Sequence, residues 1–155
     1  MRIPDPAQAS EFSIDVLDDD GARPASVTGC ITIGESREYF QAPLDYWGLA
    51  DYRRSWSVAL RKLVDGELAT SCLLVSVTDP ASANFIGSWP LYREGEQVFL
   101  QERLIFMDQL DAPFDIDRPW LSIDPRETVN EDGMRISEWT TDIQSIRDFL
   151  SSHLP

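Results

Sequence analysis

The sequence predicts a single α+β domain, residues 1–155, in which two or more helices pack on a mainly antiparallel β-sheet. Three observations predict this class. The chain of 155 residues has the length of one domain. About seven or eight short segments carry strand patterns joined mostly by short turns, and two segments carry the 3.6-residue period of an amphipathic helix. Because strands and helices do not alternate, the pattern does not fit a doubly wound parallel sheet.

The N-terminal part predicts three strands. Residues 1–11 are rich in proline and polar side chains, and we expect them to form a loose segment. The segment Phe12–Leu17 alternates apolar and polar residues, which is typical of a half-buried strand. Residues 26–33 and 37–44 have similar strand patterns, and Gly34–Ser36 between them fits a tight hairpin turn.

An amphipathic helix is predicted next, ending before Gly66, because glycine is favoured just past helix C-termini. Asp51 lies near its start and Lys62 near its end, so both charges complement the helix dipole. Apolar residues recur at spacings of three and four, which places them on one face. We therefore expect most of the aromatic residues here to belong to the core. The predicted apolar face comprises Leu49, Tyr52, Trp56, Leu60 and Leu63.

The second half of the chain predicts further strands and a closing helix. Residues 69–77 form a strongly apolar strand, and residues 84–92 and 97–106 are joined by a predicted hairpin turn. Residues 107–127 show little regular pattern, whereas 135–141 predict a last short strand. Asp142 is placed to cap a final helix. That helix presents one apolar face, formed by Ile143, Ile146, Phe149 and Leu150.

The chain is strongly acidic, and its charge is unevenly distributed. The formal net charge is −14 at pH 7, of which residues 1–47 carry −6, residues 48–106 carry −1 and residues 107–155 carry −7. The sequence offers no basic stripe to neutralise phosphates, so neither nucleic acid nor an anionic membrane is an expected partner. The acidity instead predicts attraction to a basic partner, which salt should weaken.

The sequence also predicts a cytoplasmic location. No apolar run approaches the ~20 residues of a membrane-spanning helix, and the first residues lack the apolar region of a secretory signal. Cys30 and Cys72 each lie within an apolar strand pattern. Two isolated, buried thiols in a reducing compartment fit this setting better than a disulfide.

Residues suited to catalysis are scarce. His153 is the only histidine, and its place near the chain end makes it a poor general base. Together with two cysteines it does not supply the four ligands of a structural zinc site. The stretch DAPFDID, residues 111–117, lacks the glycine and the terminal glutamate of a calcium loop. We therefore predict a non-enzymatic binding protein without metal or cofactor. An acidic hydrolase or metal-dependent enzyme built on the carboxylates stays open as an alternative.

Several stretches, taken in their order along the chain, resemble a known family. They are ITIGESREYFQAPLDYW, DYRRSWSVALRKLVDG, SCLLVSVTDP, WPLYREGEQVFLQERLIF and PRETVNEDGMRISEWTTDIQSI, and they span about residues 30–147. In this order they resemble the immunity proteins of contact-dependent growth inhibition systems. The resemblance implies a cytoplasmic protein that binds the C-terminal domain of a cognate toxin and blocks it. Such toxins are frequently nucleases, which are often basic because their substrates are polyanions. An adaptor protein with a partner other than a toxin is the remaining alternative.

Two acidic clusters are the candidate toxin-binding residues. The first is irregular and interleaves aspartates with apolar residues, a mix that suits an interface with apolar anchors inside a charged rim. The second is a run of three aspartates in a turn, which we rank lower. The candidates are Asp108, Asp111, Phe114, Asp115, Asp117 and Trp120 in the first cluster, and Asp18, Asp19 and Asp20 in the second.

Overall fold

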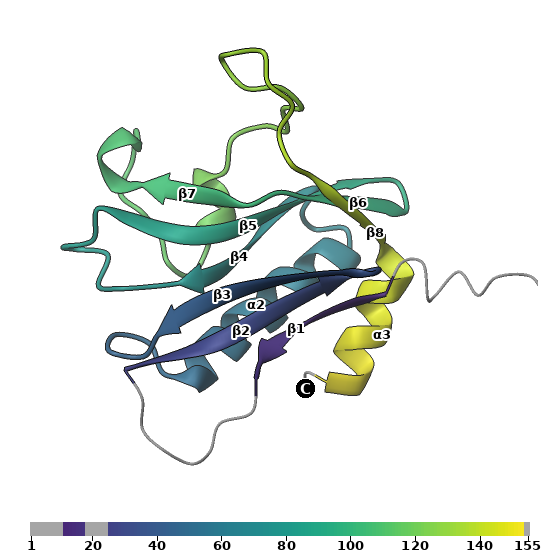
Figure 1. Ribbon diagram of the computed structural model, residues 1–155, viewed down its shortest axis with the longest axis horizontal. Coiled ribbons are helices and arrows are strands. Elements are labelled where there is room, and N and C mark those ends of the chain that lie inside the picture. The colour runs from purple at the N-terminus through teal and green to yellow at the C-terminus, as the bar shows by residue number, and fades with distance from the viewer. Residues whose placement is uncertain (1–10, 18–24, 154–155) are drawn as a thin grey trace, which may run out of the picture.

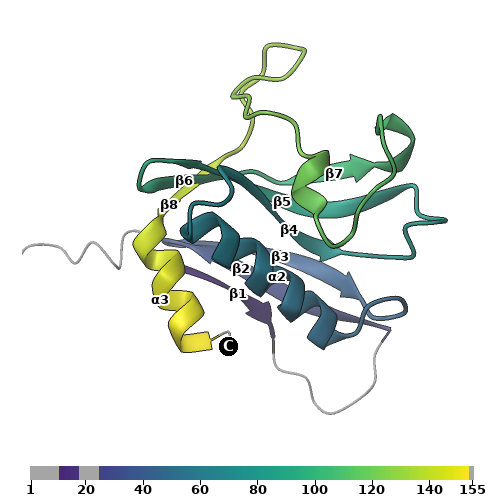
Figure 2. The same cartoon turned by 180° about the vertical axis from the view of Figure 1, so that it is seen from behind.

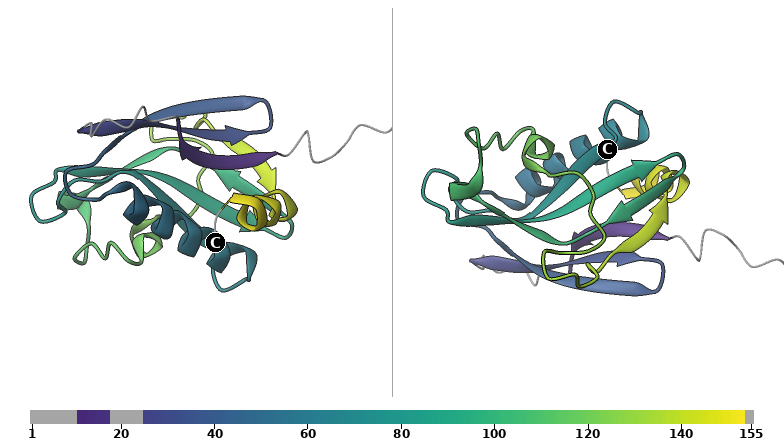
Figure 3. Two further views of the ribbon diagram at one scale, coloured as in Figure 1. Left: turned by 90° about the horizontal axis from the view of Figure 1, so that it is seen from below. Right: turned by 90° about the horizontal axis from the view of Figure 1, so that it is seen from above.

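The computed structural model describes residues 11–17 and 25–153, and it confirms the predicted α+β class (Figure 1). The strands form two antiparallel sheets, where the sequence had predicted one. Figure 3 shows these sheets as separate layers. Sheet A has the order β1-β2-β3, comprising β1 (Phe12–Val16), β2 (Ser26–Ile33) and β3 (Ser36–Pro43). Sheet B has the order β4-β5-β6-β8 with β7 also paired to β5, comprising β4 (Thr70–Ser76), β5 (Phe85–Glu94), β6 (Gln97–Leu100), β7 (Arg103–Phe106) and β8 (Trp139–Asp142).

Sheet A buries one face and exposes the other, as its alternating sequence predicts. Ile31 and Ile33 of β2 face the core together with Ile14 of β1. Gly29 lies opposite Phe40 of β3, and a side chain at Gly29 would collide with the Phe40 ring. The prediction that both thiols are buried is wrong for one of them. Cys30 is half-exposed because it lies on the outer face of β2, whereas Cys72 of β4 is fully buried.

The predicted amphipathic helix is α2 (Leu49–Val64), and its apolar face packs into the hydrophobic core. Trp56 is fully buried; its Nε1 donates a hydrogen bond to the Leu74 carbonyl of β4 over 2.7 Å. Its ring also contacts that of Phe40 of β3 edge-on, 6.1 Å between centroids. The hydroxyl of Tyr52 donates to the Pro43 carbonyl, and burial raises its pKa to about 12. One helix therefore joins both sheets.

The strand predicted over residues 97–106 is divided into β6 and β7. Both parts pair with β5 in a common register, Leu91 opposite Leu100 and Ser88 opposite Arg103. The interruption lies opposite Pro90, whose carbonyl accepts a hydrogen bond from the Gln101 amide over 3.1 Å. Since proline has no N–H, it cannot return that bond, and the ladder is broken there.

The closing helix α3 (Ile143–His153) begins as predicted. The Asp142 carboxylate accepts a hydrogen bond from the Ser145 amide over 2.8 Å, which caps the helix. All four residues of the predicted apolar face are buried. Phe149 contacts Phe12 of β1, with 5.6 Å between ring centroids. Figure 2 shows α2 and α3 on the same side of the molecule.

Candidate functional site

The first candidate cluster lies between β7 and β8, in a segment that contains two short 3-10 helices, η1 (Met107–Gln109) and η2 (Pro119–Ser122). Phe114 and Trp120 are half-buried and pack against the hydrophobic core. The carbonyl of Asp124, just after η2, accepts a hydrogen bond from the Tyr92 hydroxyl of β5 over 3.1 Å. The half-buried Phe114 and Trp120 therefore help to hold the segment against its own body.

The four aspartates of the first candidate cluster differ in their surroundings. Asp108, Asp111 and Asp117 are exposed. Asp115 instead accepts a hydrogen bond from the Arg118 guanidinium over 2.9 Å, and another from the Asp117 amide over 3.0 Å. The Arg118 contact holds the pKa of Asp115 below its usual range. Asp115 thus organises the loop, while the other three carboxylates face solvent.

A surface cleft of about 420 Å³ brings part of this cluster beside α2. On the helix side the cleft includes the ion pair between Asp51 and Arg54, 3.2 Å apart. Its wall combines apolar and charged groups, which makes it suited to a protein side chain. The lining residues are Trp47, Asp51, Arg54, Ser55, Val58, Ile116, Asp117 and Trp120. The second candidate cluster, Asp18, Asp19 and Asp20, lies outside the described residues.

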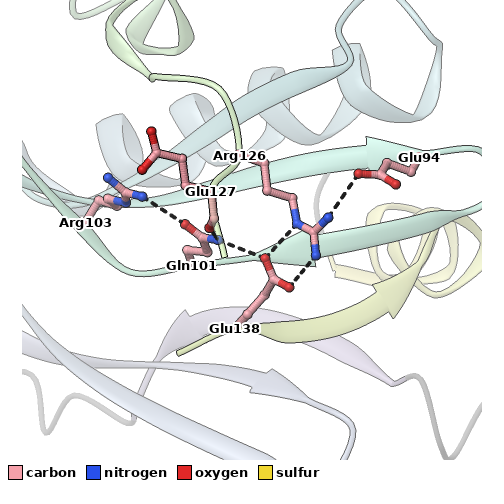
Figure 4. A network of polar contacts seen from close by, with 6 residues as sticks. All are labelled: Glu94, Gln101, Arg103, Arg126, Glu127 and Glu138. Carbon is pink, nitrogen blue, oxygen red and sulfur yellow. Dashed lines mark hydrogen bonds and ion pairs between the residues drawn. The ribbon is translucent and has the colours of Figure 1, made fainter. Parts of the chain in front are cut away.

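Sequence reasoning missed a network of charged side chains on sheet B (Figure 4). Arg126 forms two hydrogen bonds to the Glu138 carboxylate, of 2.6 and 2.8 Å, and one of 3.1 Å to Glu94. The buried Gln101 donates from Nε2 to both Glu138 and the backbone carbonyl of Glu127, each over 2.8 Å. The guanidinium of Arg126 also lies over the ring of Phe99, 3.8 Å from its centroid.

This network closes the base of a hairpin, residues 127–137, which projects from the body at the top of Figure 1. The hydrogen bonds from Arg126 lower the pKa of Glu138 and stabilise its charged form, and Glu138 in turn raises the pKa of Arg126. The sequence indicated the turn of this hairpin, because Glu131-Asp132-Gly133 has the composition of a turn, but it did not indicate the charged network. The partners at the base come from β5, β6 and the irregular stretch before β8, and that convergence depends on the fold.

Two features of the described part of the chain concern other classes of function. No helix in it is long and apolar enough to cross a membrane. The same residues contain no group of three or more histidine, cysteine, aspartate or glutamate side chains placed to hold a metal ion.

Comparisons with known proteins agree on one family. The family described as the CdiI N-terminal domain matches residues 42–149. The chain is 38% identical over 124 residues to "Immunity protein CdiI" of Enterobacter cloacae subsp. cloacae, covering 79% of this chain and 83% of that protein. It is also similar to a chain of the "CdiA-CT/CdiI toxin and immunity complex from Enterobacter cloacae", with a TM-score of 0.80, 34% identity, and coverage of 91% of this chain and 97% of that one. With the fold and the sequence in agreement, the chain belongs to the CdiI family of contact-dependent growth inhibition immunity proteins.

Proposed function

We propose that the protein binds the C-terminal toxin domain of its cognate CdiA and neutralises it as a stoichiometric inhibitor without turnover. The observation that carries this proposal is the similarity over 91% of the chain to a chain of a toxin–immunity complex. The interaction takes place in the cytoplasm of the protected cell, where the immunity protein meets the delivered toxin. A carboxylate-based enzyme or an adaptor for another partner would be favoured if the cognate toxin does not bind.

The charge of the chain supports a basic, nuclease-type toxin. A net charge of −14 attracts a basic protein and speeds its association at low salt. A nuclease needs a basic surface because it binds polyanions, and an acidic inhibitor competes for that surface with the phosphates. We propose the nuclease class on the strength of this charge argument.

We place part of the interface on the segment 108–117 and the adjoining cleft beside α2. Asp108, Asp111 and Asp117 are exposed and supply a charged rim. Asp117 and Trp120 also line the cleft, which offers partly apolar space for a partner side chain. Asp115 is a poorer contact candidate because its carboxylate already binds Arg118.

The test is a triple variant, Asp108→Lys, Asp111→Lys and Asp117→Lys, which keeps the pair between Asp115 and Arg118. Growth rescue by co-expression with the toxin gene, together with calorimetric titration at low and moderate salt, measures binding. Loss of a buried charge pair costs about 2–5 kcal/mol, whereas loss of exposed charges mainly slows association and flattens the salt dependence. Unchanged affinity and salt dependence would remove this segment from the interface. Failure of the unmodified protein to rescue growth would contradict the proposed function itself.

A further inference from the structure

We propose that the projecting hairpin, residues 127–137, is a rigid second contact element that inserts its apolar tip residues into a basic surface of the toxin. This inference rests on the proposed function and deepens it by naming a contact surface that no sequence pattern indicated. In this proposal the ion-pair network at the base of the hairpin holds it in a fixed direction (Figure 4).

The hairpin holds its shape through its own backbone. Val129 and Arg135 form a β-bridge, and the Asn130 amide donates to the Met134 carbonyl over 2.8 Å. The side-chain oxygen of Asn130 accepts hydrogen bonds from the amides of Asp132 and Met134, each 2.9 Å long. Gly133 has a φ of 77°, which glycine adopts at little cost in a tight turn. The tip is therefore preorganised, which reduces the entropy lost when a partner binds.

The base is fixed to sheet B by partly buried charges. The side chains of Arg126 and Glu138 are 24% and 18% exposed, so their pair is better shielded from solvent than ordinary surface pairs. Arg126 precedes the hairpin and Glu138 follows it, so their pairing holds its two ends together. Gln101 adds a bond to Glu127 in the hairpin itself. The hairpin consequently projects in a defined direction instead of swinging freely.

The apolar side chains of the hairpin are exposed. Residues 127–135 are all exposed, and Val129 and Met134 are 51% and 64% exposed. A hairpin that only connected two elements would not need apolar side chains directed into water. Methionine is a side chain that adapts to irregular partner surfaces, and a rigid apolar tip inside a polar rim has the composition of an interface centre.

Charge identifies the kind of partner. Glu127, Glu131 and Asp132 are close to Val129 and Met134 along the chain, and Arg135 is the single base among the hairpin residues, so the hairpin carries a net negative charge. A second copy of this chain would bring two acidic hairpins and two chains of charge −14 together, which opposes pairing. A basic surface with a small apolar depression complements the tip. Figure 1 shows the hairpin projecting beyond sheet B, where a partner can reach it.

The central test removes the apolar tip. The double variant Val129→Ser and Met134→Ser is titrated with the purified toxin domain, beside wild type and a control variant, Tyr39→Ser. Tyr39 is a matched control because it is 58% exposed and lies on β3 of the other sheet. We expect the double variant to raise Kd by about thirtyfold or more, as loss of a hot spot does, with an unchanged melting temperature. The control should keep wild-type affinity.

A second variant tests the acidic residues of the hairpin separately from its apolar residues. Glu131→Gln with Asp132→Asn should slow association at low salt and flatten its salt dependence, because exposed rim charges act mainly on the association rate. The control is Glu35→Gln with Asp45→Asn, which changes the net charge equally at exposed positions outside the hairpin. A smaller effect from the control would show that the position of the charges matters. Equal effects would show that only the overall field acts and would remove the charged rim from the proposal.

The outcomes distinguish this inference from the function on which it rests. If wild type binds the toxin and the tip variant binds equally well, the hairpin is not a contact and the inference is wrong, while the proposed function stands. If wild type does not bind the toxin or rescue growth, the proposed function is wrong. If the tip variant binds weakly but melts at a lower temperature, Met134→Lys alone decides, because a lysine at an exposed position preserves the fold. Wild-type affinity of that variant would overturn the inference.

Discussion

Two neighbouring acidic segments, 107–123 and 127–137, lie between β7 and β8. The first packs against the body of the protein, whereas the second projects from it. Both interleave carboxylates with apolar residues, so they look alike in sequence. In the first, Phe114 and Trp120 pack against the core, and the segment is held down by its apolar residues. In the second, Val129 and Met134 are exposed, and the segment is held by hydrogen bonds and a charged base. The same composition therefore serves attachment in one segment and presentation in the other.

The physical reason for this difference is what each segment passes over. The segment 107–123 runs beside sheet B and α2, where apolar surface is available, and Pro119 in η2 is buried. The hairpin extends away from the body, so it finds no apolar surface and satisfies its polar backbone internally. The following predictions test this contrast in order of decreasing effect.

The largest loss of stability is expected when a buried side chain of the core is truncated. Trp56→Ala should lower the free energy of unfolding by about 3–5 kcal/mol, because it removes a fully buried ring and leaves a cavity. Against a typical total of about 5–15 kcal/mol, this loss should unfold a large part of the population on warming. Urea denaturation followed by tryptophan fluorescence measures it. A melting temperature within a few degrees of wild type would mean that α2 does not fill the core.

Trp120→Ala should have an intermediate effect. A half-buried ring loses about half the apolar contact of a buried one, so we expect a loss of about 1–2 kcal/mol and faster proteolysis within 107–123. Leu121→Ala is the matched control, since the neighbouring Leu121 is 64% exposed and its truncation should change stability by less than about 0.5 kcal/mol. Equal losses for the two variants would contradict the attachment of this segment through Trp120.

The charged base of the hairpin should respond to acid. Because Arg126 lowers the pKa of Glu138, this carboxylate stabilises the fold above its ordinary pKa of about 4.3, and the contribution is lost as pH falls through the lowered value. Glu138→Gln should therefore destabilise the protein by about 1 kcal/mol at pH 7 and by progressively less towards pH 3. Denaturation of both proteins across this range measures the difference. A difference that is constant with pH would exclude the ion pair as its source.

The smallest effect is expected at the tip of the hairpin. Met134→Ser should change the free energy of unfolding by less than about 0.5 kcal/mol, because the side chain is 64% exposed. Thermal denaturation beside Trp120→Ala makes the comparison direct. A loss as large as that of Trp120→Ala would show that the hairpin packs on the body and would end the contrast between the two segments.

Local sequence patterns predicted much of the fold because their causes are local. The apolar face of α2 follows from a 3.6-residue period, and the Asp142 cap follows from the position of one carboxylate before a helix. The division of the strand at Gln101 was not predicted, since its cause is Pro90 on the facing strand. The exposure of Cys30 was likewise missed, because an apolar stretch does not reveal which face of a strand is covered.

For the candidate site, the sequence identified an acidic, partly apolar segment but not the direction of its side chains. Asp108, Asp111 and Asp117 are exposed as an interface requires, whereas Asp115 is engaged by Arg118 and Phe114 is turned towards the core. The pairing of Arg126 with Glu138 has no local signal, because the two residues are brought together only when the hairpin closes.

By itself the sequence determined the class of the fold, the acidity of the surface and the resemblance to immunity proteins. These properties depend on composition, on short periodic patterns and on the order of recognisable stretches. They can therefore be predicted without knowing the long-range contacts. The tertiary structure decided that the strands form two sheets joined by α2, and which of two similar segments is anchored and which projects. The reason is that burial depends on the apolar surface that distant parts of the chain place beside a residue, and residue type alone does not specify that neighbour.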